Sequence, residues 1–113
     1  MTALNVRTSD RPGGVQVHLA GELDIASAAK LEEELAPVEA RKPPLLVIDL
    51  RSLDFMDSSG LRALVAADTR AREQGRRLVL IRGRERVQKV FTITRLDERF
   101  EIVDDGESLL GAA

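Results

Sequence analysis

The chain has 113 residues, of which 43% are hydrophobic, 3% aromatic and 32% charged, and its formal net charge is −2 at pH 7. This length suits one domain with an aliphatic core. The shortage of aromatic side chains argues against base-stacking and carbohydrate sites, and the interspersed charges argue against a direct nucleic-acid partner. Because the chain has no cysteine and a single histidine, disulfides, thiolate chemistry and a His-rich metal site are excluded.

The amino-terminal residues lack a basic stretch followed by an apolar one, so we expect no signal peptide. The apolar runs, such as residues 45–48, are far too short to span a bilayer. We therefore expect a cytoplasmic protein without a membrane partner.

Two alternating segments open the chain, at residues 4–8 and 15–19. Alternation of apolar and polar side chains predicts strands, and the Pro- and Gly-rich stretch 10–14 between them predicts a tight turn. The two segments should therefore form an antiparallel hairpin. His18 falls on the polar phase of the second strand, so we expect it to be solvent-exposed and without a functional role.

A loop at 21–24 is expected to lead into a helix over 26–40, capped by Asp24 or Ser27. The apolar stretch 45–50 that follows is typical of a buried strand in a parallel sheet.

The remainder of the chain alternates in the same way between helical and extended patterns. We expect, in order, a loop at 51–57, a helix over 58–74, a strand at 78–81, a helix over 84–94, an edge strand at 100–103 and a last short helix from 104 that contains Leu109 and Leu110. This order predicts a single α/β domain over residues 1–113, with a mixed four- to five-stranded sheet, an N-terminal hairpin, β-α crossovers and about four helices.

The most informative segment is Leu-Asp-Phe-Met-Asp-Ser-Ser-Gly-Leu-Arg, residues 53–62. It lies between a buried strand and a helix, where open α/β sheets present their sites. The free N–H groups and the dipole of the helix N-terminus favour negative charge, so a phosphate on Ser58 could be accommodated there. Asp57 or Ser58 could equally serve as a plain N-cap, and the spacing alone leaves both interpretations open.

Three motifs in this sequence resemble those of the anti-sigma factor antagonist family, the founding members of the STAS domain. In chain order they are Gly-Glu-Leu-Asp at 21–24 with Ser27, Phe-Met-Asp-Ser-Ser-Gly-Leu at 55–61 after the apolar strand, and Val-Phe-Thr-Ile-Thr-Arg-Leu at 90–96 followed by Phe100 and Asp104-Asp105. The likeness covers nearly the whole chain. Arg95 is a departure, because a glycine is expected there at the end of the third helix.

The resemblance implies a STAS fold and a partner-switching function. Ser58 would accept a phosphoryl group from ATP held by an anti-sigma factor with serine kinase activity, and a metal-dependent serine phosphatase would remove it. The unphosphorylated form would bind the anti-sigma factor and free the sigma factor. Asp24, Asp57, Ser59 and Gly60 would contribute to partner binding. Asp24 could also be a pure helix cap, and Gly60 either a point of close backbone approach or relief from crowding. Ser59 could be a helix-start residue or, as the less favoured alternative to Ser58, the phosphoacceptor.

The sequence contains neither a phosphate-binding Gly-x-x-x-x-Gly-Lys-Ser/Thr loop nor the kinase signatures, so we expect no enzyme, no catalytic residue, no metal and no cofactor. A receiver phosphorylated on Asp49 is a weaker alternative, since the acidic pair and the lysine that such a site needs are missing. A magnesium site built from Asp24, Asp49, Asp54 and Asp57 is a further alternative. We prefer the interpretation that these aspartates are helix caps and solvated loop residues. STAS modules of stress-sensing or lipid-transport ATPase complexes keep the fold and change the partner.

Overall fold

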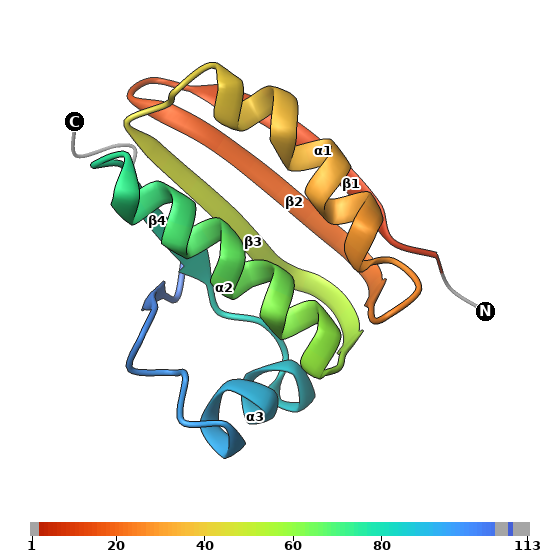
Figure 1. The fold of residues 1–113 in the computed structure, drawn as a ribbon. Helices are drawn as coiled ribbons and strands as arrows, with labels where there is room; N and C mark the ends of the chain where they lie inside the picture. Colours follow the sequence, from red (N-terminus) through yellow and green to blue (C-terminus); the bar gives the residue numbers. More distant parts are fainter. Residues whose placement is uncertain (1–2, 106–108, 110–113) are drawn as a thin grey trace.

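The computed structural model describes residues 3–105 and Leu109. Over these residues the chain forms five strands and three helices. In chain order they are β1 (Asn5–Arg11), β2 (Gly14–Leu23), α1 (Ala28–Ala40), β3 (Leu45–Met56), α2 (Ser58–Glu73), β4 (Arg77–Ile81), α3 (Glu85–Ile93) and β5 (Glu101–Val103). The strands build one sheet in the order β1-β2-β3-β4-β5 (Figure 1).

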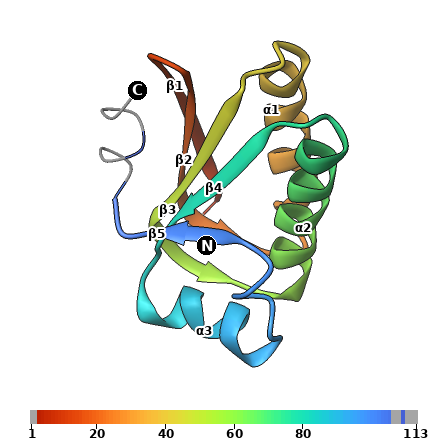
Figure 2. The same ribbon diagram turned by 90° about the vertical axis from the view of Figure 1, so that its left-hand side faces the viewer.

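The sheet is mixed, as predicted. β1 pairs antiparallel with β2, from Asn5 opposite Ala20 to Arg11 opposite Gly14, which confirms the N-terminal hairpin. The other neighbouring pairs are parallel. Because the parallel strands follow one another in a single direction, right-handed crossovers carry the connecting helices to the same face of the sheet. Figure 2 shows α1 and α2 side by side on that face, with α3 at one end of the sheet.

The main core lies between the helices and the sheet and is almost entirely aliphatic. Its aromatic contact is a T-shaped pair of Phe91 and Phe100, whose ring centroids are 5.4 Å apart. The opposite face of the sheet carries a smaller cluster of Leu45, Val47, Val79 and Ile81, against which Val103 and Leu109 pack. Both faces of the central strands are therefore buried, which explains the continuous apolar stretch that begins β3.

Two predicted loops are wrong, because they are parts of strands. β2 continues to Leu23 and β3 continues to Met56, with Gly21 opposite Leu53 and Leu23 opposite Met56. Register shifts in this part of the pair break the simple alternation, so the extension does not show in the hydrophobic pattern. β4 ends at Ile81, opposite Asp49 of β3. Because β3 continues to Met56, the segment that follows β3 lies well past the end of β4.

The first three predicted helices are confirmed in place, with shifted ends. The first begins at Ala28 instead of residue 26, because Asp24 and the residues after it form a turn. Arg95 follows the third helix with a φ of 62°, the left-handed conformation for which a glycine was expected. The short helix expected from residue 104 lies largely outside the described residues.

Candidate functional site

The candidate site is the junction between β3 and α2. Asp57 leaves β3 with extended backbone angles, and α2 begins at Ser58. The Asp57 carboxylate accepts hydrogen bonds through Oδ1 from the backbone N–H groups of Ser59 (2.9 Å) and Gly60 (3.0 Å). Asp57 is therefore the N-cap, which resolves the choice that the sequence left open. Ser58 is exposed at the first position of the helix.

The loop between β2 and α1 has its own carboxylate, Asp24. Its Oδ1 accepts hydrogen bonds from the backbone N–H groups of Ala26 (3.0 Å) and Ser27 (3.1 Å). The hydroxyl of Ser27 donates to the backbone oxygen of Glu22 at 2.8 Å, and Ser27 makes no side-chain cap of α1. These hydrogen bonds stabilise the turn before α1. The half-buried Asp24 directly follows the end of β2 and is held there by the turn.

The β2–α1 loop and the β3–α2 junction are joined directly. The backbone N–H of Ile25 donates to Asp57 Oδ2 at 3.3 Å, and the N–H of Asp57 donates to the backbone oxygen of Leu23 at 3.2 Å. One carboxylate therefore caps α2 through Oδ1 and binds the neighbouring loop through Oδ2. The structure brings together two segments, around Asp24 and around Asp57, that the sequence could name only separately.

Gly60 lies where α2 crosses the end of β2. A Cβ atom at this position would be 2.5 Å from the backbone oxygen of Leu23 and 2.7 Å from Leu23 Cγ. Gly60 is buried, and its role is close approach to β2, one of the two roles left open from the sequence. Its contact with a partner remains a prediction.

Beside the exposed Ser58, the surface carries an apolar side chain, Ile25, which is 79% exposed. It borders a shallow cavity of about 400 Å³ between the first turns of α1 and α2. The lining residues are mainly small and apolar, namely Ile25, Ala28, Ala29, Glu32, Ser59, Arg62, Ala63 and Ala66. An exposed apolar surface of this kind suits contact with another protein.

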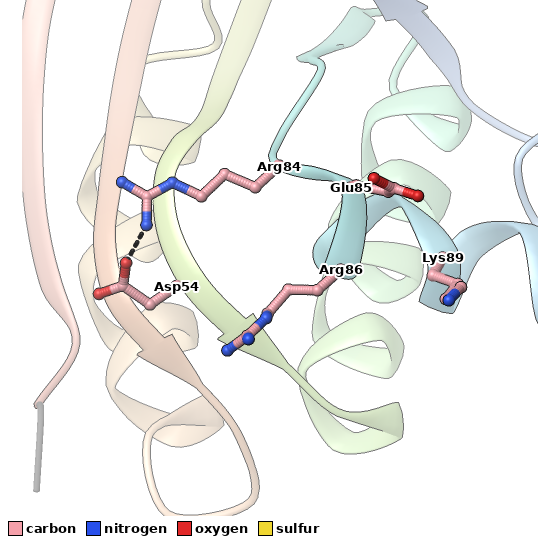
Figure 3. A pocket seen from close by; sticks show the side chains of 5 residues that line it. All are labelled: Asp54, Arg84, Glu85, Arg86 and Lys89. Atoms are coloured by element: carbon pink, nitrogen blue, oxygen red, sulfur yellow. Dashed lines mark hydrogen bonds and ion pairs between the residues drawn. The ribbon is translucent and has the colours of Figure 1, made fainter.

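A second, more polar cavity of about 630 Å³ separates the end of β3 from the start of α3 (Figure 3). Three basic side chains, Arg84, Arg86 and Lys89, line it together with Asp54 and Glu85. Arg84 forms an ion pair with Asp54, which the dashed line in Figure 3 marks. The two carboxylates of this cavity thus lie among cations, which opposes the binding of a metal ion there.

The four aspartates considered as a magnesium site do not form one. Within residues 3–105 and Leu109, no group of three or more potential ligand side chains could hold a metal ion. Asp57 is engaged by backbone N–H groups, Asp54 by Arg84, and Asp49 by Arg51. Asp49 lies in the middle of β3, whereas the phosphorylated aspartate of a receiver would lie near a strand end. The consecutive strand order also differs from the 2-1-3-4-5 order of receiver-like folds.

The expectation of a solvent-exposed His18 is wrong. His18 is half-buried on the helix-free face, with Nδ1 3.3 Å from Asp49 Oδ2 and Nε2 3.3 Å from the hydroxyl of Ser9. Gln16 Nε2 also donates to Asp49 Oδ2, at 3.3 Å. Burial, the largest single influence, disfavours the charged carboxylate, but the hydrogen bonds and charge of Arg51, aided by His18, outweigh it and lower the pKa of Asp49. The cluster of His18, Asp49 and Gln16 links β2 to β3 on the helix-free face of the sheet and does not include Ser58.

The fold and the site together define a STAS domain, and residues 3–108 match that family. The chain is 35% identical over 99 residues to the anti-sigma-B factor antagonist of Bacillus subtilis (strain 168), covering 88% of this chain and 90% of that protein. The protein belongs to the anti-sigma factor antagonist family, whose members are regulatory binding proteins.

Solved structures agree with this membership. The crystal structure of an anti-sigma factor antagonist from Mycobacterium paratuberculosis superposes with a TM-score of 0.86 and 28% identity, covering 97% of this chain and 93% of that chain. The Bacillus cell fate determinant SpoIIAA in its phosphorylated form shares the fold, with a TM-score of 0.70 and 20% identity over 98% of this chain and 100% of that one. No helix among the described residues is long and apolar enough to cross a membrane.

Proposed function

We propose that this protein binds an anti-sigma factor with serine kinase activity while unphosphorylated, and releases it when Ser58 is phosphorylated. The observation that carries the proposal is the exposed Ser58 at the start of α2, beside the joined loops of Asp24 and Asp57. A serine phosphatase would restore binding. In this scheme the protein is a cytoplasmic substrate and ligand, and the kinase supplies ATP and the catalytic groups.

The geometry of Asp57 bears on what a phosphate at Ser58 would do. Two N–H groups of the α2 N-terminus, from Ser59 and Gly60, already donate to the Asp57 carboxylate. A phosphoryl group on Ser58 therefore has fewer free donors within the chain than a bare helix N-terminus would offer. It stands next to a carboxylate of like charge and is directed to the outside of the molecule.

The added charge then acts at the interface more than within the fold. Phosphorylation adds about −1.5 to −2 charges at pH 7. A helix N-terminus stabilises a nearby negative charge by only about 0.3–1 kcal/mol. Like charges forced together and stripped of water at an interface cost on the order of several kcal/mol. A penalty of about 3 kcal/mol lowers affinity more than a hundredfold.

The experiment compares partner affinity for the unmodified, Ser58→Ala, Ser58→Asp and phosphorylated forms, with circular dichroism on each. Ser58→Ala should bind as the unmodified protein does, Ser58→Asp more weakly, and the phosphorylated form at least a hundredfold more weakly. The helical signal should stay the same, and mass spectrometry after incubation with kinase and ATP should find the phosphate on Ser58. Ser59→Ala is the matched control and should still be phosphorylated. Phosphate found only on Ser59, Thr92 or Thr94, or equal affinities for all four forms, would contradict the proposal.

A further inference from the structure

The end of the sheet opposite Ser58 contains a buried cation, Arg76, that has no counter-charge among residues 3–105 and Leu109. Arg76 is 9% exposed, and its terminal nitrogens Nη1 and Nη2 are buried with no hydrogen-bond partner among the described residues. No acidic side chain among the described residues forms an ion pair with Arg76. A buried guanidinium in this state is unusual, because removing it from water costs free energy that only a partner can return.

The helix ends nearby do not supply that partner. The backbone oxygens of Arg70, Ala71 and Arg72, at the end of α2, accept from the N–H groups of residues 74–76. At the end of α1, the oxygens of Val38 and Glu39 accept from the N–H groups of residues 41 and 42. These carbonyl groups, which would normally receive a basic side chain, are thus already engaged by backbone.

Arg76 lines a cavity of about 410 Å³ together with Lys42 and Gln74. Among the described residues, the lining contains two cationic side chains and no acidic one. Nε of Arg76 donates to Oε1 of Gln74 at 3.1 Å, which fixes the guanidinium plane and leaves both terminal nitrogens for another acceptor. Of these lining residues, Lys42 and Gln74 are exposed and Arg76 is buried.

We propose that this cavity is a binding site for a phosphate group of a small anionic ligand. The fork of Nη1 and Nη2 matches two oxygens of an oxyanion, and Lys42 adds a point charge. Two positive charges suit a phosphate dianion better than a single carboxylate. The volume falls within the range of small-molecule sites, about 300–1,000 Å³.

The proposed phosphate site is separate from the proposed switch at Ser58. The 16 residues of α2 place its two ends about 24 Å apart. Figure 1 shows that α1 and α2 end at the same end of the sheet and that α2 begins at the other, and Arg76 follows the end of α2 by three residues. Failure of either proposal therefore leaves the other untouched.

The test is a titration of the unphosphorylated full chain with inorganic phosphate at constant ionic strength, monitored through amide chemical shifts by NMR. Phosphate should cause saturable shifts at Lys42, Gln74 and the amide of Arg76, whereas chloride should not and acetate should bind more weakly. In Arg76→Met these shifts should vanish or require at least tenfold more phosphate, since both fork donors are gone. The matched control is Arg41→Gln, which removes one positive charge next to Lys42 from a side chain that pairs with Asp10; its affinity should change by less than about threefold, because an exposed pair contributes little.

A second variant, Lys42→Gln, covers the case in which Arg76→Met does not fold, because Lys42 is exposed; it should weaken phosphate binding severalfold. The absence of saturable shifts in the unmodified protein would overturn the proposal. Equal phosphate affinity in the unmodified protein and in either lining variant would also overturn it, and acetate binding as tightly as phosphate would refute the choice of a phosphate group.

Discussion

Gly60→Ala should destabilise the protein although it replaces glycine in a helix. Alanine is favoured over glycine inside a helix by about 1 kcal/mol. Here the new Cβ would lie 2.5 Å from the backbone oxygen of Leu23 and 3.0 Å from Met56 Cγ. Overpacking against a fixed neighbour costs about 1–3 kcal/mol, and a backbone carbonyl cannot move aside as a side chain can, so the upper part of that range applies. We expect a net loss of about 2 kcal/mol.

Urea unfolding of Gly60→Ala measures this loss, and Ala66→Gly in the same helix is the matched control for helix propensity. The control should be destabilised by about 1 kcal/mol, so an unhindered exchange at residue 60 would stabilise by the same amount. If Gly60→Ala destabilises the protein, its effect has the opposite sign to that of helix propensity, and the difference reports the close contact between α2 and β2. The new Cβ atom should push α2 away from β2. Partner affinity should then fall as well, because this displacement would separate Asp57 from the N–H groups that it caps. If Gly60→Ala were as stable as the unmodified protein, the close approach would not hold α2 in place.

Asp57→Ala removes the cap of Ser59 and Gly60 and the bond to the Ile25 N–H, so its free energy of unfolding in urea should fall by about 1–2 kcal/mol. Asp54→Ala loses only an exposed ion pair and should change it by less than about 1 kcal/mol; equal losses would show that the cap contributes nothing. Arg95→Gly relieves a left-handed backbone with a φ of 62° and should raise stability by about 0.5–1 kcal/mol in thermal unfolding. A lower midpoint would mean that the Arg95 side chain stabilises more than its backbone costs.

The pattern of apolar residues was enough to predict the architecture, because each element buries one side or both in a regular way. The alternating hairpin, the continuous stretch that begins β3 and the helical spacing in α2 are local signals. The end of β3 was missed for a physical reason: its partner there is the end of β2, and the register shifts between them remove the period on which the prediction depends.

The parts of the site that depend on distant residues could not be predicted. Asp57 and Ser58 are both good N-caps, and the choice is made by Ile25, which adds a third N–H donor to Asp57 from another loop. His18 reads as a polar strand residue, and its burial follows from Asp49 on the adjacent strand. Arg76 carries no local signal, since its isolation results from the way two helix ends are capped by backbone. The sequence therefore predicted where the candidate site lies, and tertiary contacts decide how its residues are held.

The buried carboxylate of Asp49 should make stability depend on pH in the acid range. Its pKa is lowered in the folded state, so its contribution to stability is complete above the unfolded value of about 3.9 and is lost as the pH falls through the folded value. Asp49→Asn removes this dependence together with the charged acceptor of the Arg51 hydrogen bonds, which should cost about 1–3 kcal/mol at pH 7. Glu101, whose pKa Arg77 lowers by a hydrogen bond, titrates in both proteins and cancels in the comparison. Urea unfolding of both between pH 7 and pH 3 should show their stabilities converging toward acid. A difference between them that stays constant over this range would mean that Asp49 is not held as a charged group.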